Sequence, residues 1–350
     1  MTHLELLLPF GLLPPTLGDD LLRSLNAPAL AMLLARTRFG AAGFRAESSD
    51  PYARALPHEL WNARRAGLPA DPQAGGSPPL AAAALRQHGL TETDGHWFLL
   101  RPVHLHIARD HLVLTDWRRL QLTEVPARRL FDTARPLFEA AGKTLRRADA
   151  DTWFVRADDW SELQTATPDA ACGHSVDIWM PHGTGELAWR KLQNEVQMEW
   201  FTDPLNEERQ AQGLEPVNSI WLWGGAPAAD TGSGDWSEVF NLPSTMACGN
   251  AARHQADSPA QLLAAKPRRA LLVLDQLSAA ALASDWGYWL ECLHALEREW
   301  FAPLLQALQA GEIGRLTLIC SNATELIEAS TSGGALRQFW IRPSLARLKR

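Results

Sequence analysis

Three groups of side chains in this sequence combine residue types and spacing that suit chemistry. His104 and His106 form a His-x-His pair in an apolar stretch that predicts a strand, so both imidazoles should point to one face. Imidazoles at this spacing suit zinc, with His111, His174 or His182 as a further ligand. The alternative interpretation is that both are ordinary polar residues on one face of a sheet.

His58 and Glu59 adjoin in a segment rich in Pro, Gly and Ala. A histidine beside a carboxylate can act as a general base, and Asp50 lies in the same segment. The alternative is structural, because a carboxylate at the start of a helix is stabilised by the positive end of the helix dipole. A short helix expected around residues 60–65 would place Glu59 in that position.

Four arginines, Arg101, Arg118, Arg119 and Arg209, form the third group. Guanidinium groups bind phosphate or carboxylate through two hydrogen bonds and need no metal to do so. If the four converge, they predict a site for a small phosphorylated or acidic ligand. The alternative is a solvated arginine face that pairs with neighbouring acidic residues. On a strand, Arg118 and Arg119 would point to opposite faces, so only one could reach a given pocket.

The apolar pattern predicts the elements that position these groups. A central segment alternates strands with two amphipathic helices, which indicates an α+β unit with its helices on one face of a sheet. The flanking segments contain continuous apolar runs typical of buried parallel strands. We expect strands at residues 5–8, 97–108, 111–114, 152–156, 174–180, 217–223, 270–274, 316–320 and 339–341, and helices at 28–38, 126–141, 186–201 and 285–310.

Composition limits the class of protein. The chain has 350 residues, 46% of them hydrophobic, which is enough for two packed domains. A net charge of −7 argues against nucleic acid or anionic lipid as a partner. Four scattered cysteines favour reduced thiols in a cytoplasmic protein, and no apolar run approaches the roughly 18 residues that a membrane span needs. The motifs of serine hydrolases, P-loop enzymes and dinucleotide-binding proteins do not occur.

One segment carries a family pattern. Residues 192–226, LQNEVQMEWFTDPLNEERQAQGLEPVNSIWLWGGA, resemble archaeal-type cofactor-independent phosphoglycerate mutases of the alkaline phosphatase superfamily, as a degenerate bacterial branch. A helix there leads into H-P-x-N-x-x-R, then G-L-x-P-x-N, then a strand that ends in a glycine turn. Asp203 stands where the family has histidine. The matching residues are Asn206, Arg209, Gly213, Leu214, Pro216, Asn218 and Gly224.

Weaker matches continue the resemblance over nearly the whole chain. Residues 98–120 resemble the family's A-F-R-C-N strand and its D-R-R segment. The resemblance places four residues near the substrate's phosphate or carboxylate, in addition to Asn206 and Arg209. These four are Arg101, Asp116, Arg118 and Arg119.

The departures from the family concern its metal ligands. In this superfamily, two divalent metals held by Asp and His activate a serine. Here Pro9 or Phe10 stands at the early aspartate position, and His58-Glu59 occupies the region of the missing serine. Asp275 is followed by QLSAAALASD instead of further ligands, and Ser321-Asn322 replaces a late Asp-His pair. Loss at four separate motifs predicts a protein that no longer needs the metals.

We therefore expect an α/β fold: an alkaline-phosphatase-like three-layer core of residues 1–95 and 224–350, with an inserted α+β domain over 96–223. The expected function is that of a metal-free pseudoenzyme with a regulatory role, which binds a small anionic metabolite or a protein partner. The alternative is an active mutase or phosphatase-like hydrolase that uses Mn or Zn at a rearranged site. In that case His58, Glu59 and Asp275 are the catalytic candidates.

Overall fold

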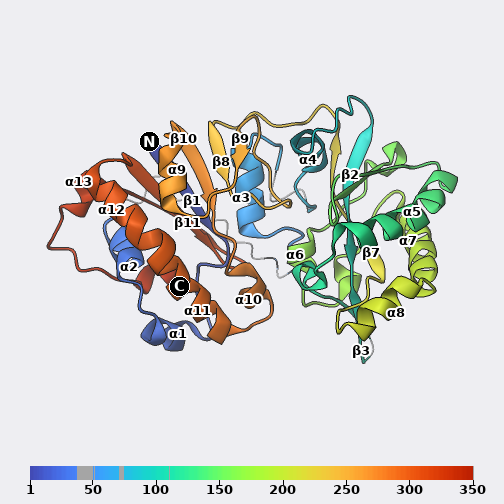
Figure 1. Ribbon diagram of the computed structural model, residues 1–350, viewed down its shortest axis with the longest axis horizontal. Helices are drawn as coiled ribbons and strands as arrows, with labels where there is room; N and C mark the ends of the chain where they lie inside the picture. The colour runs from blue at the N-terminus through green and yellow to red at the C-terminus, as the bar shows by residue number, and fades with distance from the viewer. Residues whose placement is uncertain (38–49, 51, 71–74, 110, 350) are drawn as a thin grey trace. The chain divides into compact units, whose positions relative to one another are not determined.

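A computed structural model describes residues 1–37, 50, 52–70, 75–109 and 111–349 of the chain (Figure 1). The chain forms two compact units, each of which is considered by itself. Unit 1 comprises Met1–Pro51, Ser233–Pro243 and Cys248–Arg350. Unit 2 comprises Tyr52–Gly232 and Ser244–Ala247.

Unit 1 is built on a six-stranded sheet with the order β12-β11-β1-β10-β8-β9. The first strand, β1, lies between β10 and β11 and is parallel to both, with Leu6 opposite Leu272 and Leu318. The leucines of β1 are almost completely buried, as expected for a strand in a sheet that is flanked by helices. Only the β11–β12 pair is antiparallel among these neighbours. The strands are β1 His3–Leu8, β8 Glu238–Phe240, β9 Ala252–His254, β10 Arg269–Val273, β11 Arg315–Ser321 and β12 Leu326–Ser332.

A long helical segment beside this sheet confirms the helix expected over 285–310. It consists of α11 (Trp286–Leu296), a π-helical turn over Glu297–Phe301, and α12 (Ala302–Ala310). The buried carboxylate of Glu297 accepts hydrogen bonds from the backbone N–H groups of Ala29 and Leu30, at 2.6 and 3.1 Å. It thereby satisfies two free donors at the start of α2. The other helices of unit 1 are α1 Gly18–Ser24, α2 Pro28–Ala35, α9 Pro259–Ala264, α10 Ser278–Leu282, α13 Gly333–Leu336 and a 3₁₀ turn Ala346–Leu348.

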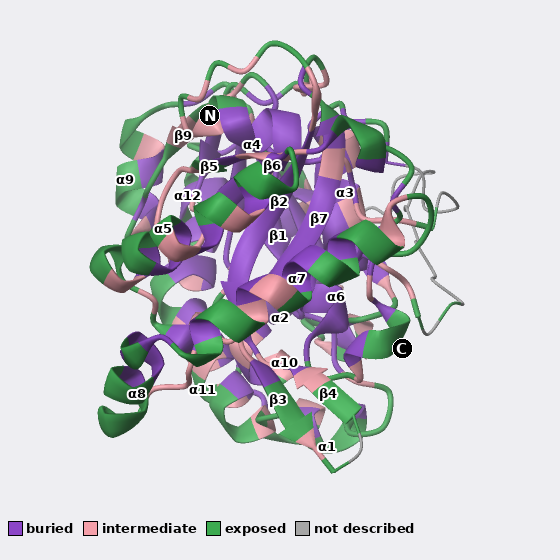
Figure 2. Cartoon of the chain, turned by 90° about the vertical axis from the view of Figure 1, so that its right-hand side faces the viewer, coloured by how far each residue is buried: buried purple, intermediate pink, exposed green. Residues whose placement is uncertain are grey.

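Unit 2 contains an antiparallel sheet with the order β5-β6-β2-β7. Two amphipathic helices, α5 and α7, lie over this sheet, and Figure 2 shows β2 and β7 buried beneath them. Their apolar faces enclose a core rich in tryptophan, in which Trp153 meets Trp200 edge-on with ring centroids 6.0 Å apart. The strands are β2 His96–Val103, β3 Leu105–Ala108, β4 His111–Leu114, β5 Thr144–Arg147, β6 Trp153–Arg156 and β7 Ser219–Pro227. The helices are α3 Pro57–Arg65, α4 Ala81–Gln87, α5 Glu124–Ala140, α6 Pro168–Ala171, α7 Glu186–Phe201 and α8 Pro204–Ala211, with 3₁₀ turns Trp117–Leu120, Asp158–Trp160 and Val176–Ile178.

The predicted α/β fold is confirmed, since a mostly parallel sheet flanked by helices accompanies a separate antiparallel sheet. The compact units divide the chain at other positions than the expected 95/96 and 223/224. Residues 52–95 belong to unit 2, where α4 packs against β2 and β7. Strand β7 also continues through Gly224-Gly225 to Pro227. Gly224 has a φ of +69° within the strand, a conformation that glycine adopts readily.

Two predicted strands were wrong. Residues 174–180 form a 3₁₀ turn over Val176–Ile178, and residues 339–341 lie in turns. The expected strand over 97–108 divides into β2 and β3, which belong to different sheets. Its second part pairs with β4 in a separate hairpin. Apolar alternation over a short stretch therefore indicated extended chain correctly in the hairpin and wrongly at the two turns. Among the described helices, none is both long and apolar enough to cross a membrane.

Candidate functional site

Three of the four positions where metal ligands were expected lie at one edge of the unit 1 sheet. They follow the carboxyl ends of the parallel neighbours β1, β10 and β11, which is where α/β sheets usually hold their sites. The backbone N–H of Phe10 donates to Ser321 Oγ over 3.3 Å, so two of the loops are joined directly. The carbonyl of Phe10 accepts a hydrogen bond from Trp289 Nε1 at 3.0 Å. Phe10 itself has a φ of +54°, an unusual conformation for a bulky residue.

The polar side chains at this edge make local structural bonds. Asp275 accepts a hydrogen bond from the hydroxyl of Ser278 at the start of α10. Asn322 accepts hydrogen bonds from the backbone N–H groups of Thr324 and Glu325, at 2.9 and 2.8 Å, and so closes the turn between β11 and β12. In the part of the chain that the structure describes, no three His, Cys, Asp or Glu side chains form a group able to hold a metal ion.

His58 and Glu59 lie at the start of α3 in unit 2, and both are buried. Glu59 Oε2 accepts hydrogen bonds of 2.7 Å from the backbone N–H of Leu56 and from Thr167 Oγ1. This is the helix-start role that the sequence offered as the alternative to catalysis. Burial, with the nearby charge of Asp169, raises the pKa of Glu59 to about 8, so the carboxyl group is protonated at neutral pH. Burial lowers the pKa of His58 to about 4, and its imidazole is neutral.

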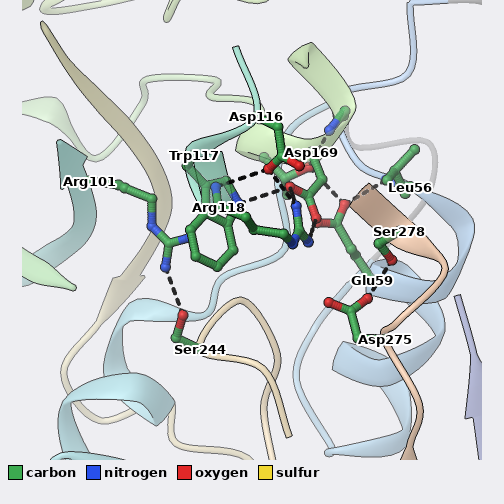
Figure 3. A network of polar contacts seen from close by, with 12 residues as sticks. Leu56, Glu59, Arg101, Asp116, Trp117, Arg118, Asp169, Ser244, Asp275 and Ser278 are labelled. Atoms are coloured by element: carbon green, nitrogen blue, oxygen red, sulfur yellow. Dashed lines mark hydrogen bonds and ion pairs between the residues drawn. The ribbon is translucent and has the colours of Figure 1, made fainter. Parts of the chain in front are cut away.

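Figure 3 shows the ion-pair cluster that adjoins Glu59. The guanidinium of Arg118 lies between two buried carboxylates, 3.0 Å from Asp116 Oδ1 and 2.7 Å from Asp169 Oδ2. Trp117 Nε1 also donates to Asp169 at 3.0 Å. Although burial opposes ionisation, Arg118 and these hydrogen bonds hold the pKa of Asp169 below its usual range. The expected anion-binding fork of Arg118 is therefore occupied by the protein's own carboxylates.

Arg101 is completely buried on β2, and its guanidinium carbon lies over the ring of Trp117, 3.7 Å from the centroid. Its Nη2 donates to Ser244 Oγ at 2.7 Å and its Nε donates to the backbone carbonyl of Asp151 at 3.1 Å. Its Nη1 has no hydrogen-bond partner among the described residues. Burial lowers the pKa of Arg101, and the carboxylate of Asp151 opposes this shift. Among the four candidate arginines, Arg101 is thus the one with a buried donor still unused.

Asn206 and Arg209, which carried the family resemblance, bind the backbone. Asn206 donates to the carbonyls of Trp200 and Val217 and accepts from the N–H of Val217, at 2.8–2.9 Å. Arg209 donates to the carbonyls of Leu120 and Glu215, at 2.5 and 2.9 Å. Both residues therefore fasten α8 to the segments around β7. By contrast, the side chain of Arg119 is 66% exposed and 4.0 Å from a carboxylate oxygen of Glu215.

His104 and His106 do not occupy one strand. His104 lies between β2 and β3, while His106 belongs to β3, and their ring centroids are 6.3 Å apart. The two-residue spacing predicted two imidazoles on one sheet face, but the change of sheet after Val103 removes that basis. Burial lowers the pKa of His104, which keeps the ring neutral.

In unit 2, the structure brings together Arg101, Asp116 and Arg118 around Trp117, which contacts both guanidiniums. Arg209 is not part of this cluster, because its guanidinium donates to backbone carbonyls. Neither Trp117 nor Asp169 was predicted from the sequence as a site residue. The signal for Asp169 was the Thr-Pro-Asp start of a short helix, α6, which indicates an N-terminus but not an ion pair with a residue 51 positions away.

Comparisons with known proteins give a structural likeness. No protein-family model matches the sequence, and no match was found among curated proteins. The PH0037 protein from Pyrococcus horikoshii has a similar structure, with a TM-score of 0.57 and 13% identity over 99% of this chain and 91% of that one. A Cofactor-Independent Phosphoglycerate Mutase from Thermoplasma acidophilum DSM 1728 aligns with a TM-score of 0.43 and 12% identity, over 99% and 94%. The likeness to PH0037 shows a related fold.

Proposed function

We propose that this protein is a phosphoglycerate-mutase-like pseudoenzyme that acts by binding, without metal-dependent phosphoryl transfer. The observation that carries the proposal is that residues at all four positions expected to hold metal ligands make structural contacts instead. Phe10 is fixed by Ser321 and Trp289, Asp275 by Ser278, and Asn322 closes a turn. Glu59 caps α3 in a protonated form. Two divalent cations need several anionic or imidazole ligands, and these positions supply few.

The ligand in this proposal is a small phosphorylated or acidic molecule that approaches Arg101. A pocket of about 160 Å³ is lined by Arg118, Trp117 and Asp151; Arg101 contacts the last two but does not itself line the pocket. The unused Nη1 of Arg101 needs an acceptor, because a buried donor without a partner is costly. The carboxylate of Asp151 lies 3.8 Å from Arg101 Nη2 and accepts from Thr152 Oγ1 at 3.0 Å, and at 34% exposure it can accept one more hydrogen bond. A hydroxy acid or its phosphate ester carries both an anionic acceptor and a hydroxyl donor.

The catalytic half of the proposal is tested by measuring interconversion of 3-phosphoglycerate and 2-phosphoglycerate with Mn²⁺, Zn²⁺ or Mg²⁺ present. An active cofactor-independent mutase serves as the positive control. We expect no turnover above the protein-free reaction. Turnover well above that background contradicts the pseudoenzyme proposal.

The binding half is tested by thermal melting with 3-phosphoglycerate and inorganic phosphate. A ligand that binds the folded protein raises the Tm in proportion to ln(1 + [L]/Kd). We expect this increase in the wild type and in Arg190→Lys, an exposed control on α7, and its loss in Arg101→Lys, which keeps the charge but not the fork. If no phosphorylated metabolite raises the Tm, the protein does not bind a small anion, and the remaining form of the proposal is that it binds a protein partner.

A second candidate function is that of a metal-dependent hydrolase or mutase with rearranged ligands. One observation favours it: His104 Nδ1 is buried without a hydrogen-bond partner among described residues, and the ring of His106 is close to it. Stoichiometric zinc or manganese after purification, lost in His104→Ala and His106→Ala, would support this function.

A further inference from the structure

A second pocket in unit 2 has the opposite electrostatic character to the arginine cluster. Its volume is about 420 Å³, within the range of small-molecule sites. It lies among the loops that precede α4, follow the 3₁₀ turn at Asp158–Trp160, and follow β7. Glu162 and Asp230 provide carboxylates, and His96 provides an imidazole. No lysine or arginine is among the described residues that line it.

Glu162 is exposed and Asp230 partly exposed, and no lysine or arginine among the described residues pairs with either carboxylate. Neither Glu162 nor Asp230 forms an ion pair or a side-chain hydrogen bond within the described ranges. Both act electrostatically on His96, as does Asp158, whose charge is balanced by Arg156 at 3.0 Å. The half-buried imidazole of His96 nevertheless has a lowered pKa because of its burial, so it does not supply the missing positive charge. The pocket therefore repels anions and lacks a cation.

The walls of the pocket are preformed. Ser77 and Thr165 join two of its loops through a backbone bond of 2.7 Å and a hydroxyl bond of 2.7 Å, and Ser77 Oγ also accepts from the N–H of Gly224 at 2.8 Å. Gln164 is held by a reciprocal backbone pair with His182. Four prolines, whose φ angles are fixed, provide apolar surface together with two leucines. These residues are Pro69, Pro78, Pro79, Pro227, Leu60 and Leu163.

We propose that this pocket binds a small aliphatic amine. The ammonium group is held by Glu162 and Asp230, His96 accepts or donates a further hydrogen bond, and the carbon chain lies along the prolines. An ammonium supplies three donors and the charge that the two carboxylates lack. Because the pocket is preformed, less entropy is lost when a ligand binds. The carboxylates and the prolines together favour an aliphatic chain with one or two amino groups.

Isothermal titration calorimetry of the full chain with 1,4-diaminobutane tests this proposal. The matched probes are 1,4-butanediol, which has the same chain without charge, and succinate, which has the opposite charge. We expect saturable binding of the diamine, weaker binding of the diol by at least about fivefold, and no binding of succinate. Raising the salt concentration should weaken the binding of the diamine.

Variants locate the site. Glu162→Gln and Asp230→Asn should each weaken the diamine several-fold, and the double variant should abolish binding, whereas Glu199→Gln on the exposed face of α7 should bind as the wild type does. Melting temperatures within about 2 °C of the wild type establish that the variants are folded. Absence of saturable diamine binding, equal binding of the diol, or unchanged affinity in the double variant would each overturn the proposal. The phosphate-dependent melting shift assigned to Arg101 is a separate readout, so either proposal can fail alone.

Discussion

The guanidinium of Arg118 donates two hydrogen bonds to the carboxylate of Asp169, from Nη1 to Oδ1 over 3.1 Å and from Nη2 to Oδ2 over 2.7 Å. Asp116 accepts a further bond from Nη1 at 3.0 Å. The partly buried guanidinium of Arg118 thus pairs with two buried carboxylates. An external anion could gain access to Arg118 only by displacing a carboxylate of the protein itself.

We expect Arg118→Met to lower the free energy of unfolding by about 3–5 kcal/mol, because it leaves two buried carboxylates without their cation. Urea denaturation followed by tryptophan fluorescence measures this loss. The neighbouring substitution Arg119→Met is the control, since that side chain is 66% exposed, and should change stability by less than about 0.5 kcal/mol. Equal effects at the two positions would contradict the assigned roles.

Asn206→Ala should destabilise the protein by about 2–3 kcal/mol, because three buried hydrogen bonds to the backbone are lost together. It should not abolish the melting shift with 3-phosphoglycerate in protein that is still folded. Gln210→Ala on the exposed side of α8 provides the comparison. If Asn206→Ala leaves stability unchanged and removes only the ligand response, the residue belongs to a binding site after all.

The Glu59 carboxyl group predicts a loss of stability with rising pH. Its pKa is raised from 4.5 to about 8 in the folded protein, so the folded state holds the proton more tightly. This contribution is complete below pH 4.5 and is lost as the pH rises through about 8. Glu59→Gln, which mimics the protonated group, should remove most of this decline, on the order of a few kcal/mol. Urea midpoints between pH 5 and 9 measure it.

His58 gives the opposite dependence and an internal control. Its pKa is lowered from 6.5 to about 4, so the stability that its neutral form provides is present above pH 6.5 and is lost as the pH falls to about 4. This acid-side loss should remain in Glu59→Gln. If Glu59→Gln shows the same loss of stability at alkaline pH as the wild type, Glu59 is ionised in the folded protein.

Removal of metals should leave the protein unchanged. Dialysis against EDTA is expected to shift the Tm by less than about 1 °C, because stability that depends on a bound metal is lost with it. Mass spectrometry of the native protein should find less than 0.1 equivalent of Mn or Zn, as an order of magnitude. A drop in Tm that added Zn²⁺ restores would instead support the site at His104 and His106.

Long periodic elements were predictable from the sequence, and side-chain pairings were not. The helices over 126–141 and 186–201 and the strands over 270–274 and 316–320 agree with α5, α7, β10 and β11 to within a few residues. Each has a sustained apolar pattern that its packing satisfies.

The candidate site was less predictable because its roles depend on distant partners. Nothing local distinguishes Arg118, which is bound by Asp169, from Arg119, which is exposed. The motif residues Asn206 and Arg209 were interpreted as ligand-binding candidates because of a resemblance, but the groups they contact are backbone carbonyls of remote segments. The structural role of Glu59 was anticipated, because a helix start is a local feature, and so was pairing of an arginine with a neighbouring carboxylate, as between Arg118 and Asp116.

The central place of β1 in its sheet has a consequence for synthesis of the chain on the ribosome. Both neighbours of β1, Arg269–Val273 and Arg315–Ser321, emerge long after it. Unit 2 is nearly continuous in sequence and can assemble while those residues are still being made. The first strand therefore stays unpaired, with six leucines among residues 4–13 already exposed, until the last third of the chain is released. Nascent chains stalled before residue 315 should consequently depend on chaperones more than the finished protein does.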